Sequence, residues 1–207
     1  MKIAKLVKEI KKNGRIITRC RSENDFVWIG SSYALYPLYG MPFMRDDQIL
    51  TLLDIPLKDH GKYLIQDICG EQRDKLIDSL KDISRNKNDG LLSDGFLIDT
   101  NSESFLCFKF KDGIKFIKTT ALEIIDYEDD SCVKYIKYID DTIIISNGFV
   151  PMAIIKCYDA ISDELVNKYK TIFTLFDEAL TQKKAKEILE TNKTLNQIDF
   201  EMLSKTE

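Results

Sequence analysis

The sequence predicts an α+β protein in which one helix–strand–strand–strand unit occurs twice, with antiparallel sheets and extra C-terminal helices. The first observation is a pattern shared by residues 26–38 and 142–154: an apolar run, a small polar turn, an aromatic residue and a second apolar run. The second is that the same offset of 116 residues places Leu6 on Leu122, each near the start of an expected helix. Strands with alternating apolar residues have similar sequences, so this similarity can also arise without duplication. Duplication and chance similarity both stay open as its origin.

The first element is expected to be a helix over residues 3–12. Its apolar residues recur at helical spacing and form one stripe: Ile3, Leu6, Val7 and Ile10. The basic residues on the opposite face are Lys5, Lys8 and Lys12. Asn13 and Gly14 then end the helix, because both residue types accept a left-handed backbone conformation.

Strand and helix patterns alternate through the rest of the first half. Strands are predicted at residues 15–21, 26–29, 33–38 and 62–68. Helices are predicted at residues 46–54 and 71–83, and Asp46 and Asp47 begin the first of them, where negative charge is favoured. Residues 84–90 contain no apolar side chain and form the predicted linker.

The second half is expected to open with a strand meander. Its predicted elements are strands at 96–98, 104–110 and 114–118, a helix at 119–127, and strands at 133–139, 142–145 and 149–157. Asn147 and Gly148 mark the last hairpin turn, because they accept the positive φ angles that a tight turn needs. A long helix is expected from Ser162, and a short one at residues 195–203.

These patterns divide the chain into three parts. Residues 1–90 form a first half with inserted helices, residues 91–158 a second half, and residues 159–207 a C-terminal helical extension. The apolar stripe expected along the long helix comprises Leu165, Tyr169, Ile172, Phe173, Phe176, Ala179 and Leu180.

The composition is that of a globular protein, with 44% hydrophobic and 31% charged residues. No stretch approaches the roughly 20 apolar residues that a membrane span needs, and residues 1–5 lack the apolar core of a signal peptide. The five cysteines are dispersed and form no Cys-x-x-Cys pair, so we expect buried, reduced thiols. A cytoplasmic protein without membrane contact is expected.

The net charge of −4 conceals a strong asymmetry along the chain. Residues 1–21 hold eight lysines and arginines against Glu9 alone, a local charge of +7, so the remaining residues carry −11. Such a block is typical of a surface that binds phosphate. It is equally typical of the solvated face of a helix, and both interpretations stay open.

Aromatic residues are interleaved with basic ones in the same region. The residues concerned are Phe26, Trp28, Tyr33 and Tyr36, near Arg19 and Arg21. This arrangement can form a stacking platform for single-stranded nucleic acid. The other interpretation is that the aromatic side chains pack against helices.

No pattern in the sequence indicates catalysis. His60 is the single histidine and is expected in an exposed turn. The acidic clusters at 128–130 and 140–141 are expected to be solvated, although carboxylates from separate segments can converge on a divalent cation. Neither a phosphate-binding glycine loop nor a serine-nucleophile motif occurs. We therefore predict a non-enzymatic binding protein without a cofactor or a metal. A hydrolase that uses carboxylates and a metal ion is kept as the enzymatic alternative.

One helix followed by three strands, repeated twice, resembles the repeat unit of DNA sliding clamps. Residues 6–12 resemble the helix that lines the central hole of a clamp, and residues 141–155 resemble the hairpin that ends a clamp domain. The resemblance extends to small clamp-like proteins of phages or mobile elements. It implies contact with duplex phosphates without sequence readout. The predicted nucleic-acid-binding residues are Lys5, Lys8, Lys12, Arg15 and Arg19.

The sequence departs from the clamps in two respects. The second helix carries Glu123 and Asp126 where a DNA-lining helix is basic, and this chain supplies only one of the several domains that form a ring. The alternative hypothesis is therefore a protein-interaction or assembly module, with a protein partner or a second copy as its ligand. The orientation of the lysines in residues 2–12 discriminates between these two hypotheses. Lysines on a surface shared with Arg15 and Arg19 favour nucleic-acid binding.

Overall fold

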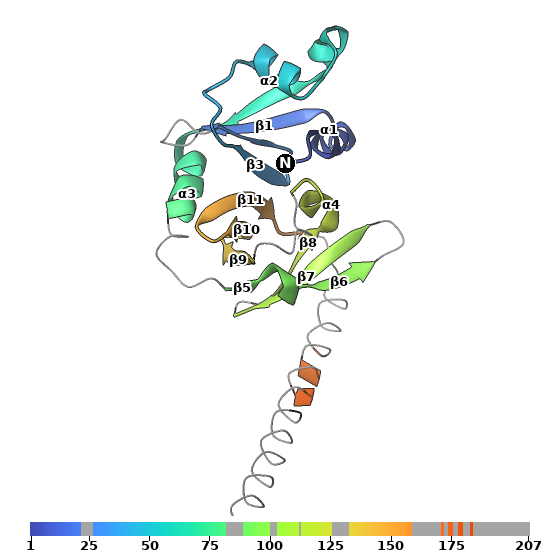
Figure 1. Ribbon diagram of the computed structural model, residues 1–207, viewed down its shortest axis with the longest axis vertical. Coiled ribbons are helices and arrows are strands. Elements are labelled where there is room, and N and C mark those ends of the chain that lie inside the picture. Colours follow the sequence, from blue (N-terminus) through green and yellow to red (C-terminus); the bar gives the residue numbers. More distant parts are fainter. Residues whose placement is uncertain are drawn as a thin grey trace, which may run out of the picture. The chain divides into compact units, whose positions relative to one another are not determined.

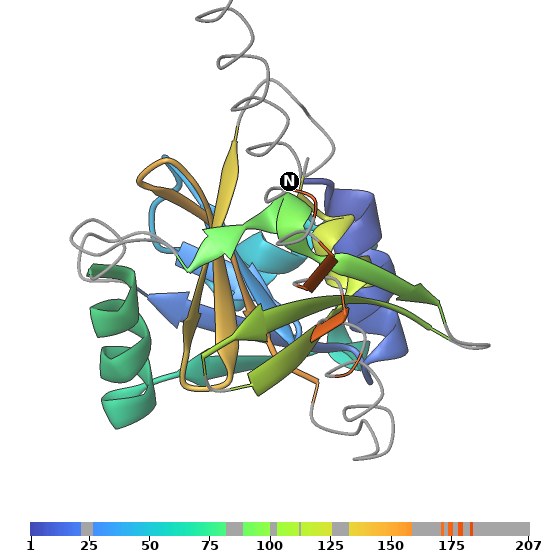
Figure 2. The ribbon, with the colours of Figure 1, turned by 90° about the horizontal axis from the view of Figure 1, so that it is seen from below.

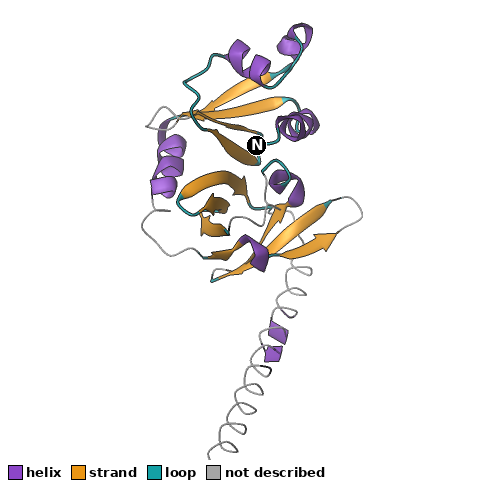
Figure 3. Ribbon diagram, viewed as in Figure 1, coloured by secondary structure: helices purple, strands orange, loops and turns teal. Residues whose placement is uncertain are grey.

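A computed structural model describes residues 1–21, 27–81, 89–99, 103–111, 113–125 and 133–158, and positions 171, 174, 175, 178, 179 and 183. The protein is mixed α+β, with two sheets and few helices among these residues (Figures 1 and 3). The chain divides into two units, Met1–Asp159 and Ala160–Glu207. None of the described helices has the length and apolarity to cross a membrane.

The first unit contains all the strands of the described chain. Its helical elements are α1 (Ile3–Lys12), α2 (Asp46–Leu52), η1 (Leu57–Lys62), α3 (Gly70–Lys81), η3 (Leu92–Asp94) and α4 (Thr119–Leu122). Its strands are β1 (Ile16–Arg21), β2 (Val27–Gly30), β3 (Ala34–Leu38), β4 (Leu64–Ile68), β5 (Gly90–Leu91), β6 (Phe96–Asp99), β7 (Ser104–Phe110), β8 (Gly113–Lys118), β9 (Lys134–Ile139), β10 (Thr142–Asn147) and β11 (Val150–Lys156).

The larger sheet has the strand order β4-β1-β2-β3-β11-β10-β9-β5. All neighbours pair antiparallel except β1 and β4, which are parallel. The two hairpins predicted from the sequence are confirmed, since β2 pairs antiparallel with β3 and β10 with β11. Between them, β3 and β11 pair through Leu35 and Ile154 and join the two halves of the chain in one sheet.

One face of this sheet holds the main core. Leu6 and Ile10 of α1 have no exposed surface and pack there with apolar residues of α2, α4 and the strands. Burying each such side chain contributes about 1.5–3 kcal/mol, which explains why the helical spacing of these two residues determines the orientation of α1. The opposite face is covered by α3, whose Leu76 and Leu80 pack on a second cluster around Trp28. Figure 2 shows α1 and α3 on opposite sides of the sheet.

The smaller sheet is the predicted meander, with the order β6-β7-β8 and antiparallel pairing throughout. Phe108 of β7 and Ile117 of β8 are buried in the same core as α1. The smaller sheet therefore closes the core on the side that carries α1 and α4.

The three-strand meanders β1-β2-β3 and β9-β10-β11 occupy mirrored places in the larger sheet. At the hairpin turns their registers correspond, because the pair Gly30–Leu35 and the pair Ser146–Pro151 are separated by the same 116 residues. Beyond Ile145 the second hairpin shifts register by one residue at a β-bulge. Strand order and turn register thus agree between the two meanders, whereas the register further along the strands does not.

Several sequence-based expectations need correction. The helix predicted at 119–127 is a single turn, α4, and residues 123–125 form a turn; residues 126 and 127 lie outside the described residues. The sheets were expected to be antiparallel, yet β4 pairs parallel with β1. The segment with α2 and η1 connects β3 to β4, so that β4 runs in the same direction as β1. Among the described cysteines, Cys20, Cys107 and Cys157 are buried as expected, but Cys69 is exposed.

The second unit is described at six helical positions. They are Thr171, Thr174, Leu175, Glu178, Ala179 and Lys183, and all are exposed. Their spacing places them on one face of a helix, in agreement with the helix expected from Ser162. Ala179 was expected in the apolar stripe but is exposed, and the other stripe residues and residues 195–203 lie outside the described residues.

Candidate nucleic-acid interface

The exposed face of α1 carries most of the predicted phosphate-binding residues. Lys5, Lys8 and Lys12 are exposed and lie opposite the buried Leu6 and Ile10. The helix is formed because its apolar residues follow the helical period and because Gly14, with φ of 76°, adopts the left-handed conformation after its last turn. Neither Lys8 nor Lys12 makes an ion pair with another described residue. Two unpaired ammonium groups therefore face solvent one helical turn apart.

Lys5 differs from its neighbours on this face because it is paired. Its Nζ donates to Glu123 Oε2 at 2.9 Å, and both side chains are about half exposed. The contact joins α1 to the segment after α4, and the backbone nitrogen of Lys2 donates to the carbonyl oxygen of Ile124 at 2.7 Å beside it. The acidic residue noted in the sequence therefore neutralises one lysine of the basic face.

Arg15 extends the basic face beyond the end of α1. Its side chain is exposed, its backbone nitrogen donates to Ile10 O at 2.9 Å, and its carbonyl oxygen accepts from Leu64 N at 3.1 Å. The backbone thus ties the helix terminus to β4. The pKa of nearby Asp59 is lowered, chiefly by the hydrogen bond from Lys62, with smaller contributions from Lys58 and Arg15.

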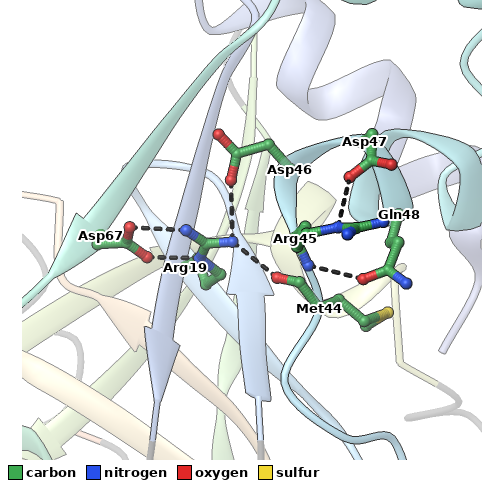
Figure 4. A network of polar contacts seen from close by, with 7 residues as sticks. All are labelled: Arg19, Met44, Arg45, Asp46, Asp47, Gln48 and Asp67. Atoms are coloured by element: carbon green, nitrogen blue, oxygen red, sulfur yellow. Dashed lines mark hydrogen bonds and ion pairs between the residues drawn. The ribbon is translucent and has the colours of Figure 1, made fainter.

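Arg19 does not belong to this surface, which corrects the sequence-based prediction. Only 7% of its side chain is exposed. Its Nε and Nη2 donate to the two carboxylate oxygens of Asp67 at 2.5 and 2.7 Å, and its Nη1 donates to the carbonyl oxygen of Met44 at 2.8 Å. The same Nη1 lies 3.0 Å from Asp46 Oδ1 (Figure 4).

The Arg19 contacts are structural in character. The hydrogen bond to Asp67 raises the pKa of Arg19, and the guanidinium holds the pKa of Asp67 below its ordinary value. A bidentate pair of this geometry is among the stronger polar contacts in proteins. The pair fastens β1 to β4, and the contacts of Nη1 with Met44 and Asp46 hold the start of α2, so every nitrogen of the Arg19 guanidinium is engaged within the protein.

Arg45 and Gln48, also visible in Figure 4, complete the start of α2. The backbone nitrogen of Arg45 donates to Gln48 Oε1 at 2.9 Å, and Arg45 Nε lies 3.4 Å from Asp47 Oδ1. Asp46 and Asp47 occupy the first turn of the helix, as the sequence predicts.

The described members of the interleaved aromatic set do not form an exposed stacking platform. Trp28 and Tyr36 are buried, and the Tyr36 hydroxyl donates to Ala121 O at 2.8 Å. Tyr33 is partly exposed, and Phe26 lies outside the described residues. Burial raises the pKa of Tyr36 well above its ordinary value. The Trp28 and Tyr36 rings therefore serve packing, and they are placed by the strands β2 and β3.

The other candidate chemical groups also have structural roles. Asp140 and Asp141 both have positive φ and form the tight turn between β9 and β10. Asp141 accepts from Lys115 at 2.8 Å and from the Tyr138 hydroxyl at 2.7 Å, and these bonds lower its pKa, Lys115 contributing most. His60, expected in an exposed turn, is half-buried in η1 with its Nε2 at 2.9 Å from Ile55 O.

The described residues contain no group of three or more His, Cys, Asp or Glu side chains that could hold a metal ion. Residues 128–130, the larger acidic cluster, lie outside the described residues.

One cluster was missed by the sequence reasoning. Lys118 Nζ lies over the rings of Tyr33 and Tyr158, at 5.2 and 4.8 Å from their centroids, and donates to Glu103 at 2.7 Å. Lys118, Tyr33 and Tyr158 line a small hollow beside α1, together with Glu9 and Lys156. No sequence signal could have found it, because its members come from five separate segments.

No family model matches the chain, and neither a curated protein nor a solved structure matches it.

Proposed function

We propose that this protein is a non-enzymatic, clamp-like protein that binds the nucleic-acid backbone through the exposed face of α1. The observation that carries the proposal is the position of Lys8 and Lys12, which are exposed and lack an ion pair within the described part of the chain. An unpaired ammonium group attracts a phosphate without first breaking an existing contact. Binding of this kind releases condensed counterions and reads no sequence.

The arrangement of the strands supports the clamp-like part of the proposal. The order β1-β2-β3-β11-β10-β9 places two meanders side by side, and α1 and α4 meet on the same face through Lys5 and Glu123. This arrangement resembles a clamp domain, in which two copies of a helix and three strands are related by a local two-fold axis. We propose a duplicated unit whose second helix was shortened to one turn.

The residues of the interface rank by their availability. Lys8 and Lys12 come first, Arg15 extends the surface, and Lys5 contributes less because Glu123 neutralises it. For about three neutralised phosphates, the affinity should fall by roughly 40-fold between 50 and 200 mM salt. Duplexes of unrelated sequence should bind equally, because contacts with phosphates carry no sequence information.

The test is a fluorescence-anisotropy titration of a labelled duplex of about 30 base pairs at low salt. The double variant Lys8→Glu and Lys12→Glu reverses two exposed charges on α1. The matched control is Lys75→Glu and Lys81→Glu on α3, which makes the same charge change on the opposite face of the sheet.

We expect the α1 variant to lose at least about 10-fold in affinity, with a shallower salt dependence, and the α3 variant to lose less than about 3-fold. The proposal is wrong if the unmodified protein does not bind duplex at about 50 mM salt. Equal losses in the two variants would show a response to net charge alone and would also reject the α1 interface.

A second candidate function is self-association. It is favoured by a separate observation, the exposed apolar side chains at one end of the larger sheet, and is developed below.

A further inference from the structure

Large apolar side chains gather at one end of the larger sheet. The pairs Arg21–Val27 and Asn147–Val150 lie at this end, where β1, β3 and β10 finish and β2, β9 and β11 begin. The exposed apolar residues that follow or precede these strands are Tyr39, Met41, Phe43, Val133, Phe149 and Val150. We name this set the apolar end.

The centre of the apolar end is the tip of the β10–β11 hairpin. Phe149 is 78% exposed and Val150 52% exposed. Val133 precedes Lys134, which pairs with Asn147, so it lies beside the tip. The Tyr39 hydroxyl donates to the carbonyl oxygen of Pro151, which places Tyr39 on the first residues of β11. These four residues therefore lie at neighbouring strand ends of the same sheet.

The rim of the apolar end carries charges of both signs. The ring of Phe43 lies 5.2 Å from the guanidinium carbon of Arg21. Two residues further on, Arg45 is three-quarters exposed, and its Nε lies 3.4 Å from the exposed Asp47. A rim of this kind is compatible with an identical rim facing it, because Arg45 of one copy can approach Asp47 of the other.

The size of the apolar end separates it from ordinary surface residues. Six large side chains, between 43% and 78% exposed, together present on the order of 500 Å² of accessible surface. Isolated exposed hydrophobics are common, but contiguous patches of this size usually mark an interaction site. Two such surfaces in contact would bury roughly 1,000 Å², which is the lower limit for a specific protein interface.

We propose that the apolar end is a homodimer contact in which two copies of this chain pack hairpin tip against hairpin tip about a two-fold axis. An isologous contact requires a self-complementary surface. An apolar centre with a rim of both signs meets this requirement, whereas a single-sign rim would repel its copy. The contact is independent of α1, so it holds whether or not the protein binds nucleic acid.

The test is sedimentation velocity of the full chain from about 1 to 100 µM, a range that covers the affinity of small interfaces. The variant Phe149→Asp places a charge at the centre of the proposed contact. The matched control is Leu57→Asp on η1, an equally exposed leucine (82%) outside the apolar end. Both substitutions replace a solvent-exposed side chain, and circular dichroism verifies that each variant folds.

We expect the unmodified protein and the Leu57→Asp variant to sediment as two copies at the upper concentrations. The Phe149→Asp variant should sediment as a monomer, with its dissociation constant raised at least about 30-fold. A monomeric unmodified protein, a species larger than two copies, or a Phe149→Asp variant that remains dimeric would each overturn the proposal. Loss of the dimer in the Leu57→Asp variant would likewise overturn it, because the contact would then lie elsewhere.

Discussion

The meanders β1-β2-β3 and β9-β10-β11 share their strand order but differ in what covers them. In the first, every residue of β2 is buried, because α1 packs on one face and α3 on the other. In the second, the corresponding residues 143–146 of β10 are buried as well, although α4 is only one turn long. The central strands of the two meanders are therefore buried alike, whereas the helices beside them differ in length and charge.

The helices of the two meanders also differ in the charge that they present. The first helix presents Lys8 and Lys12 to solvent, whereas the segment after α4 presents Glu123 to Lys5. Among the described residues, the helix of the first unit therefore presents unpaired basic side chains, whereas the helix of the second is followed by an acidic one. Four further predictions concern the first meander and its contacts, from the largest expected effect to the smallest.

The largest effect is expected at the turn of the first hairpin. A Cβ atom on Gly30 would lie 1.8 Å from the carbonyl oxygen of Ala34, and backbone cannot move away as a side chain can. The corresponding position of the second meander is Ser146, whose side chain is accommodated beside the bulge. We expect Gly30→Ser to lower the free energy of unfolding by about 3 kcal/mol or more, measured by urea denaturation.

The reciprocal change Ser146→Gly is the control and should cost only about 1 kcal/mol. Similar losses at the two positions would show that the hairpins are equivalent at their turns, and the comparison drawn above would fail.

A smaller effect is expected from the fastening of β4 to the first meander. Asp67→Asn removes the charged partner of buried Arg19, and we expect a loss of about 1–2 kcal/mol, since Asp67 itself is half-exposed. Asp74→Asn, which breaks the exposed pair with Arg73, is the control and should be nearly neutral. Hydrogen exchange should show faster opening of β4 in the first variant only.

The same pair predicts a dependence on pH. The pKa of Asp67 is lowered in the folded state by the hydrogen bond from Arg19, so the pair contributes fully above the unfolded pKa of about 3.9. This contribution is lost as the pH falls below that value and through the folded pKa. At acid pH, the free energy of unfolding should therefore fall less steeply with decreasing pH in Asp67→Asn than in the unmodified protein. Identical slopes would contradict a lowered pKa of Asp67.

The smallest effect is expected from releasing Lys5. Glu123→Gln removes the carboxylate that pairs with Lys5, so one more ammonium group becomes available to phosphate. We expect duplex affinity to rise by about 2- to 3-fold at low salt, with a stability change below about 0.5 kcal/mol. Glu71→Gln, which releases Lys75 on α3, makes the same charge change and should leave affinity nearly unaltered. A matched rise in both variants would indicate a general charge effect.

Local patterns determined most of the elements of this fold. The helix predicted at residues 3–12 is α1 with the same bounds, and both hairpins form where alternating apolar runs flank Gly30 and Gly148. Periodicity and turn chemistry act over a few residues, so they are legible in the chain itself. Where the local signal was weaker, as in the acidic stretch after Thr119, the predicted helix was too long.

By itself, the sequence determined that the first unit is α+β and that Lys5, Lys8 and Lys12 share the face of α1 opposite its apolar stripe, because helical spacing sets both. Only the tertiary structure decided which basic residues remain available. Arg19 is buried against Asp67, 48 residues away, and Lys5 is paired with Glu123, 118 residues away. Contacts at such separations depend on how strands order themselves in the sheet, and that order follows from the packing of the whole core, which no local pattern encodes.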